Sequence, residues 1–401
     1  MNTASGHLTY CTNIHSGESW QDHFNAIKTN FPFIKKQVSA NAPMGIGLRL
    51  SNEASVSLVN AENLAEFKSW LKENDAYVFT MNGFPYGNFH KTRVKDHVHS
   101  PDWTTDERVA YTNRLFDILA CLVPQGMDGG VSTNPISYRR WFTAESFPSA
   151  KKMGTENMIQ VIQHLIMLHH ATGIILHLDV EPEPDGVMET GVEFIEWFNN
   201  DLLPTGIPLI MEKWNVSTEE AEKLIKQHLR LCYDVCHFAI GYEPHQQIID
   251  QLHAQQIQVG KIQISAALKA KMDEKNKMDV TKAFGKFNEP VYLHQVVAKK
   301  SDGSLIRYPD LPEALNDEKN IAGEWRAHFH VPLFVDKFGL LDSTRNEIVD
   351  VLSIQKKNPF TKHLEVETYT WEVLADELKL PIGESILREL KWVQQILDRS
   401  I

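Results

Sequence analysis

Eight short apolar runs alternate along the chain with amphipathic stretches, and this alternation restricts the possible folds more than any other feature. The stretches between the runs have helical periodicity, as in 61–74 and 106–122. Alternating buried strands and amphipathic helices are typical of a parallel sheet. The predicted strands are Leu8–Ile14, Gly45–Leu50, Ala76–Met81, Gly129–Asn134, Gly173–Val180, Leu231–His237, Gly260–Ala266 and His363–Tyr369.

Two α/β architectures fit this alternation, a closed (β/α)8 TIM barrel and a doubly wound open sheet. The open sheet ordinarily has a glycine-rich phosphate loop after an early strand, but the run Gly45-Ile46-Gly47-Leu48-Arg49-Leu50 lacks the third glycine. We interpret Gly45 and Gly47 as packing positions. Polar residues at the ends of several apolar runs favour the barrel, because its active site lies at the C-terminal ends of the strands.

The chain is longer than a plain barrel needs. It has 401 residues, whereas a TIM barrel typically has roughly 250. We predict a single barrel domain over 1–401, with an insertion at 269–335 after the seventh strand. Asp302-Gly303 lies between two apolar runs, which predicts a β-hairpin inside the insertion. We expect the insertion to form a lid over the C-terminal rim, and a final helix over 384–400, against which Trp371 packs.

Charge and cysteine usage narrow the possible partners and the compartment. The formal net charge of −12 argues against nucleic acid as a partner, because a nucleic-acid surface needs clustered Lys and Arg. The four cysteines are spread without a zinc or redox spacing, and the N-terminus has no secretory signal pattern. We therefore expect a cytoplasmic protein. Its oligomeric state does not follow from the sequence.

Carboxylates and imidazoles stand where successive apolar runs end. Glu181 follows the fifth run, Asp234 and His237 end the sixth, and Glu367 ends the eighth. Because strand ends of a barrel meet at one rim, we expect these side chains to converge on a metal or catalytic site. The alternatives are ordinary ion pairing of the glutamates and an aspartate that only orients a buried imidazole.

The motifs at these ends resemble those of a known superfamily. The D-x-x-H spacing of Asp234 and His237, with a glutamate one unit earlier and another at the final strand, resembles the xylose isomerase-like barrels. More specifically, four segments resemble EboE, a bacterial family named "metabolite traffic protein" and encoded beside a prenyltransferase-like membrane protein. These segments are 8–20, 82–87, 181–184 and 328–332. The resemblance implies metal binding by the two glutamates and Asp234, a substrate near His237, and that membrane protein as a partner.

The seventh run departs from the superfamily pattern. It reads Ile262-Gln263-Ile264-Ser265, so an amide stands where the sugar epimerases present a histidine. The expected divalent metal is manganese, magnesium, zinc or cobalt, and an amide oxygen shifts the preference from zinc toward manganese or magnesium. The missing imidazole could instead come from His328 or His330 in the insertion, which point the same way if the segment is extended. Alternatively, these two histidines only line a polar pocket.

Other polar residues follow the first four runs and are candidates for substrate binding. They stand at the correct end of the strands to bind hydroxyl or phosphate groups. Their alternative role is the capping of turns between strands and helices. These candidates are Asn13, His15, Arg49, Asn82, Tyr86, Asn134 and Arg139.

These residues predict a metal-dependent isomerase or epimerase for a small sugar or polyol, or its phosphate. The ion would bind a carbonyl and the neighbouring hydroxyl and stabilise an enediolate. Glu181 and Glu367 would move the proton, or a water held by His237 would do so. The alternatives are a barrel that binds or transfers a metabolite without chemistry, and a metal-dependent hydrolase.

Overall fold

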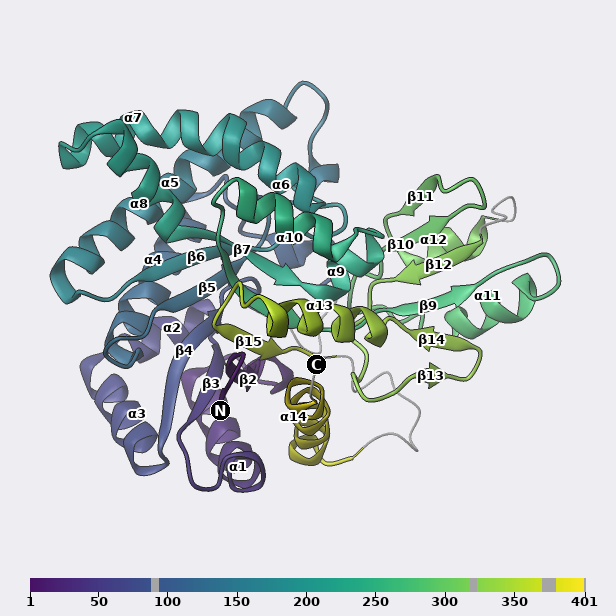
Figure 1. Cartoon of the computed structure of the whole chain (residues 1–401), viewed down its shortest axis with the longest axis horizontal. Coiled ribbons are helices and arrows are strands. Elements are labelled where there is room, and N and C mark those ends of the chain that lie inside the picture. Colours follow the sequence, from purple (N-terminus) through teal and green to yellow (C-terminus); the bar gives the residue numbers. More distant parts are fainter. Residues whose placement is uncertain (88–93, 318–322, 370–379, 400–401) are drawn as a thin grey trace.

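Eight parallel strands form a barrel in chain order, which confirms the predicted TIM-barrel class. The computed structural model describes residues 1–87, 94–317, 323–369 and 380–399, so Trp371 lies outside the described residues. Figure 1 shows the strands surrounded by helices. The barrel strands are β2 (Gly6–Tyr10), β3 (Met44–Arg49), β4 (Ala76–Asn82), β5 (Gly129–Thr133), β6 (Leu176–Val180), β7 (Leu229–Asp234), β8 (Val259–Ile264) and β15 (His363–Val366).

The barrel closes between β2 and β3 through a side chain as well as the backbone. Thr9 Oγ1 donates to the Gly45 carbonyl at 2.8 Å and accepts from the Gly47 N–H at 3.1 Å. Cys11 and Gly47 form a parallel bridge. A short strand, β1 (Asn2–Thr3), adds to β2 in the antiparallel direction. Closure thus depends on a threonine that replaces part of the backbone ladder.

Helices cover the outside of the barrel, and half of those described here begin at side-chain caps. Ser19 forms a reciprocal capping box with Asp22, and Ser217 caps another helix. No helix in the described ranges is long and apolar enough to cross a membrane. The barrel helices are α1 (Trp20–Val38), α2 (Asn52–Leu58), α3 (Ala61–Glu73), α4 (Asp106–Leu122), α5 (Phe147–Thr172), α6 (Gly191–Trp197), α7 (Leu203–Trp214), α8 (Thr218–His228), α9 (Val235–Ile240), α10 (His245–Ala254), α13 (Arg345–Lys357) and α14 (Ile382–Asp398).

Three predicted strands end at least three residues earlier than their apolar runs, and the run from His363 is one of them, ending at Val366. The run from Leu8 leaves the sheet after Tyr10 and makes a 3-10 turn at Thr12–Ile14. The run from Leu231 ends at Asp234, whose side chain accepts from the His237 N–H at 3.1 Å and so caps α9. The apolar residues after Asp234 are therefore helical. Sequence periodicity over so few residues does not separate a buried strand from a buried helix.

A second sheet follows β8 and lies to the right of the barrel in Figure 1. β10 and β11 form a hairpin, β12 pairs antiparallel with both β10 and β9, and β14 extends β9 on its other side. The Trp325 ring packs against Phe284 from the adjacent helix α11. The elements of this unit are β9 (Leu268–Lys271), α11 (Lys277–Gly285), β10 (Val296–Lys299), β11 (Leu305–Tyr308), α12 (Leu311–Asn316), β12 (Glu324–Ala327), β13 (Lys337–Phe338) and β14 (Leu341–Ser343).

The barrel interior holds charged groups in place of a purely aliphatic core. Lys261 and Glu365 are fully buried and form an ion pair between β8 and β15. Glycines make the space. A Cβ on Gly47 would lie 1.9 Å from Glu365 Oε1, and one on Gly260 would lie 1.8 Å from Asp179 Oδ1. Gly47 is therefore a packing position. The space that a side chain would fill there is occupied by the Glu365 carboxylate.

Candidate metal centre

Three buried carboxylates meet at the C-terminal end of the barrel. Glu181 directly follows β6, Asp234 ends β7 and Glu367 directly follows β15. One oxygen of each lies within 4.8 Å of those of the other two. Because parallel strands end at the same rim, residues far apart in the chain converge here. The structure thus brings together the three predicted carboxylate ligands.

The Gln263 side chain from β8 stands between the three carboxylates. Its Nε2 donates to Glu181 Oε1 at 3.0 Å, to Asp234 Oδ2 at 3.1 Å, and also to Glu367 Oε2. An amide nitrogen carries only two hydrogens. Three carboxylates therefore compete for two donors. Among the described residues, the second oxygen of Glu181 is buried with no hydrogen-bond partner.

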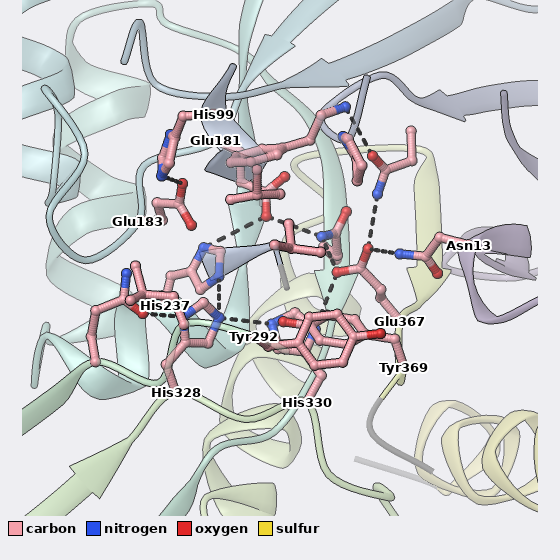
Figure 2. Close-up of a pocket in the computed structure, with 18 of the residues that line it drawn as sticks. Asn13, His99, Glu181, Glu183, His237, Tyr292, His328, His330, Glu367 and Tyr369 are labelled. Atoms are coloured by element: carbon pink, nitrogen blue, oxygen red, sulfur yellow. Dashed lines mark hydrogen bonds and ion pairs between the residues drawn. The ribbon is translucent and has the colours of Figure 1, made fainter. Parts of the chain in front are cut away.

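Three imidazoles lie beside the carboxylates, His237 from the barrel helix α9 and His328 and His330 from the segment after β12 (Figure 2). His330 Nδ1 lies 3.1 Å from Glu367 Oε2, and its Nε2 lies 3.9 Å from Asp234 Oδ2. The Nε2 atoms of His237 and His328 are 3.1 Å apart. His328 and His330 follow β12 on a segment without regular structure. The structure thus brings both histidines of the insertion to this site, and their role as ligands stays a prediction.

Neighbouring side chains orient these groups. Asn13 and Asn82 donate to Glu367 Oε1 at 2.6 and 2.8 Å. His237 Nδ1 lies 3.0 Å from the Pro182 carbonyl, and His328 Nδ1 lies 2.7 Å from Gln295 Oε1. With their Nδ1 atoms occupied, both histidines turn Nε2 toward the pocket. Such outer contacts are how proteins fix the direction of ligand side chains.

The electrostatics of the cluster are uneven. Burial, with the charges of Asp234 and Glu367, raises the pKa of Glu181 well above its usual value. Burial opposes ionisation of Asp234 too, but His237 and His330 hold its pKa below the usual value. Burial lowers the pKa of His330, yet Asp234 and Glu367 outweigh it, so the net shift is upward. The positive charge near the cluster therefore does not balance the negative charge of the three carboxylates.

A pocket lined by polar and aromatic side chains opens beside the cluster. Glu183 and His99 form one wall, with Glu183 Oε1 3.1 Å from His99 Nε2. Tyr369 packs on the His330 ring at 4.6 Å between centroids. His99, Tyr292 and Tyr369 were not predicted as site residues. They lie in short connecting segments, and sequence periodicity does not reveal where such segments place their side chains. The pocket is also lined by Phe84, Pro85, Val94, Lys95, Val98, Tyr292, Leu293 and Gln295.

Of the seven predicted substrate-binding residues, Asn13 and Asn82 line this pocket, where both hold Glu367. The structure does not bring the other five to it. Arg49 is buried with both Nη atoms within 3.4 Å of Glu18. His15 contacts Tyr10 at 3.5 Å beside the first turn.

The remaining three predicted residues stabilise loops. Tyr86 packs edge-on against Tyr111 with 5.0 Å between ring centroids. Asn134 Nδ2 donates to the Ile136 carbonyl at 3.3 Å, which is the turn-capping alternative. Arg139 donates to Glu193 at 2.7 Å and lines a different surface hollow. Sequence position at the correct strand end does not determine which way these side chains turn.

The donor set fits a divalent metal. Carboxylate oxygens of Glu181, Asp234 and Glu367 suit hard cations, and a histidine nitrogen from His330 suits zinc, cobalt or manganese. Gln263 Nε2 occupies the point between the carboxylates where a cation would neutralise their charge. Rotation of the amide by half a turn would present its Oε1 to the same point.

Comparisons with known proteins found structural likenesses only. No protein-family model matches the chain, and no curated protein is significantly similar in sequence. An IolI protein with a bound zinc atom matches at 12% identity and TM-score 0.47, over 98% of each chain. An L-ribulose 3-epimerase matches at 9% and 0.47, over 98% of this chain and 94% of that one.

A third solved structure, a xylose isomerase domain protein from Planctomyces limnophilus, matches at 12% identity and TM-score 0.41. It covers 88% of this chain and 86% of its own. At these identities and scores the likenesses support no functional assignment. The barrel assignment itself rests on the strand order and on the closure between β2 and β3.

Proposed function

We propose that the protein is a divalent-metal-dependent isomerase or epimerase for a sugar- or polyol-like substrate, free or phosphorylated. The observation that carries the proposal is the convergence of Glu181, Asp234 and Glu367 on one buried point beside the pocket. Burying three carboxylates together is costly unless a cation compensates them. A neutral amide and two imidazoles compensate them only in part.

The ligands of the metal would be the three carboxylates, with His330 as a nitrogen donor and Gln263 through its amide oxygen. When bound, such an ion polarises a substrate carbonyl and lowers the pKa of the proton on the adjacent carbon, which favours an enediolate. Asn13 and Asn82 hold Glu367 in a single orientation toward the pocket. The proposal places no further geometry on the ion.

Proton transfer would fall to the two glutamates that line the pocket. Glu181 and Glu367 both line the pocket, so each carboxylate can approach a substrate carbon. Glu367 enters from β15, on the other side of Gln263. One glutamate would remove the proton and the other return it. His237, anchored at Pro182, would hold a water or a substrate oxygen with Nε2.

Solvent exchange tests this proposal without knowledge of the natural substrate. The protein is loaded with Mn²⁺, Mg²⁺, Zn²⁺ or Co²⁺, incubated in D2O with a panel of ketoses, aldoses and their phosphates, and followed by NMR. We expect deuterium at the carbon next to the carbonyl of at least one sugar. We also expect loss of exchange and weaker metal retention in Glu367→Gln.

Glu243→Gln is the matched control, because Glu243 is a half-buried glutamate outside the pocket with a pKa raised by burial to about 8. It should exchange at the wild-type rate. Full exchange in Glu367→Gln with metal still bound would contradict the catalytic role of Glu367. Wild-type protein that takes up none of the four metals would contradict the proposal of a metal-dependent enzyme.

A second function, binding or transfer of a metabolite without chemistry, is favoured by one observation. Gln263 already donates to all three carboxylates, so the cluster has partial compensation without an ion. Gln263→Ala separates the two functions. In a metal enzyme the variant keeps metal binding through the carboxylates, whereas in a metal-free binder it loses stability and gains no metal.

We also propose that the chain belongs to the EboE family. Each segment that carries the resemblance contributes a residue to the pocket, namely Asn13, Asn82, Glu181 and His328. Membership would make a prenyltransferase-like membrane protein the partner and the cytoplasm the compartment. Recovery of the tagged protein with membranes that contain this partner, but not with membranes that lack it, tests the association.

A further inference from the structure

A second group of metal-ligand side chains lies at the opposite end of the barrel from the pocket. Asp128 directly precedes β5, His177 is the second residue of β6, and His363 is the first residue of β15. The N-terminal ends of parallel strands meet at one mouth, as their C-terminal ends do. The group therefore shares no residue with the candidate metal centre.

The three side chains approach each other at distances that an ion could bridge. Asp128 Oδ2 lies 3.5 Å from His177 Nε2, and Asp128 Oδ1 lies 3.2 Å from His363 Nε2. The ligand atoms all lie within 4.8 Å of one another. Both histidine side chains are at most 1% exposed, whereas the aspartate is 23% exposed. The site is thus closed on the barrel side and reachable from solvent at Asp128.

An additional carboxylate fixes the orientation of His177. Its Nδ1 lies 2.6 Å from Asp179 Oδ1, inside the barrel. The carboxylate fits there only because Gly260 has no side chain, since a Cβ would lie 1.8 Å from Asp179 Oδ1. A carboxylate on one ring nitrogen and a metal on the other is the usual arrangement around a metal-bound histidine.

The other nitrogen of His177 is left without a donor or acceptor of good geometry. Within the described part of the chain, His177 Nε2 and His363 Nδ1 are buried and make no hydrogen bond. If His177 donates its Nδ1 proton to Asp179, its Nε2 turns a lone pair toward the Asp128 carboxylate. A lone pair and a carboxylate that face each other repel unless a proton on Nε2 or a bound metal ion stands between them.

We propose that Asp128, His177 and His363 bind a divalent transition metal, with Asp179 as the positioning residue of His177. Two imidazole nitrogens and one carboxylate oxygen are a donor set that zinc, cobalt and related ions prefer over magnesium or calcium. Arg230 Nη1 holds the same carboxylate at 2.9 Å, which keeps Asp128 ionised and in place. The ion would link β5, β6 and β15 at the base of the barrel.

Metal counting tests the proposal with Co²⁺ and Zn²⁺ as probes. The whole protein is stripped with a chelator, reloaded, and analysed for metal per chain and for the Co²⁺ absorption spectrum. An Asp234→Asn, Glu367→Gln variant, which lacks two of the three rim carboxylates, should still bind one equivalent at the base. Adding His177→Gln or Asp128→Asn to this variant should remove that equivalent.

Two further variants separate a metal site from a hydrogen-bonded cluster. Asp179→Asn should weaken metal binding at the base by about 10–100-fold while the chain stays folded. His164→Gln is the matched control, because His164 forms an imidazole–carboxylate contact of 2.7 Å with Asp117 on the outer helices. It should change neither metal count nor affinity.

The rim variant that binds no metal, yet melts at the wild-type temperature, would overturn the proposal. So would a bound equivalent that survives both Asp128→Asn and His177→Gln. If His177→Gln fails to fold, Asp128→Asn, at a partly exposed position, carries the test. Failure at the base leaves the proposed function of the rim untouched, because the two sites are counted separately.

Discussion

The two ends of the barrel treat buried charge in opposite ways. At the C-terminal end, Glu181, Asp234 and Glu367 share a neutral amide and two imidazoles. At the N-terminal end, the single carboxylate of Asp128 is shared by Arg230 and two imidazoles. The first end has more carboxylates than positive partners, whereas the second has more donors than the one carboxylate. The rim therefore buries negative charge without a matching counter-charge, and the base does not.

The ion pair between the two ends should have the largest effect on stability. Lys261→Met leaves Glu365 buried without its partner, so we expect a loss of about 3–5 kcal/mol in unfolding free energy. Urea unfolding followed by circular dichroism measures it. The double variant with Glu365→Gln should recover much of the loss. Equal losses in the single and double variants would show that the charges are not coupled.

The rim should also lose stability as pH rises, through Glu389. This buried carboxyl accepts from Thr368 Oγ1 at 2.7 Å and from the Leu333 N–H at 3.2 Å, and burial raises its pKa to about 8. The folded pKa lies above the unfolded one, so stability is full below about pH 4.5 and falls as pH rises to 8. Glu389→Gln should remove a decrease of roughly 3 kcal/mol between pH 5 and pH 8. If the unfolding free energies of the wild type and of Glu389→Gln changed in parallel with pH, this prediction would be wrong.

Neutralising one carboxylate at each end should change stability in opposite directions. In the presence of chelator, Glu181→Gln relieves repulsion at the rim and should stabilise the fold by about 1–2 kcal/mol, at the expense of metal binding. Asp128→Asn removes the shared acceptor at the base and should destabilise it by about 1–3 kcal/mol. Thermal melts of the two variants side by side provide the comparison. Shifts of the same sign would refute the contrast between the ends.

The smallest effect should come from an equivalent contact outside the barrel. Asp117 is 45% exposed where it meets His164. Water and salt screen such a pair, so Asp117→Asn should change unfolding free energy by no more than about 0.5 kcal/mol. The same urea titration sets this baseline. A loss as large as that of Asp128→Asn would mean that burial is not what distinguishes the base.

Sequence reasoning reached the barrel and the three carboxylates because both depend on local signals. Apolar runs mark buried strands, and polar residues at their ends mark the rim, so Glu181 and Glu367 could be located without a structure. The barrel class was confirmed. The roles proposed for individual residues stay predictions.

The base of the barrel could not be predicted in the same way. His177 and His363 lie inside or beside apolar runs and look like isolated core histidines. Their relation to Asp128 depends on how strands far apart in the chain are arranged around the barrel. The directions of Arg49 and Arg139 likewise depend on Glu18, in the loop before α1, and on Glu193, in the first turn of α6.

The Lys261–Glu365 pair also bears on how the chain is made. The two residues are 104 positions apart, and Glu365 lies on the last barrel strand. When synthesis has reached only the end of β8, Lys261 therefore has no counter-charge at the position where it will be buried. We expect the barrel to close only once residue 365 has emerged from the ribosome. Until then the unfinished sheet would depend on chaperones to keep it from aggregating.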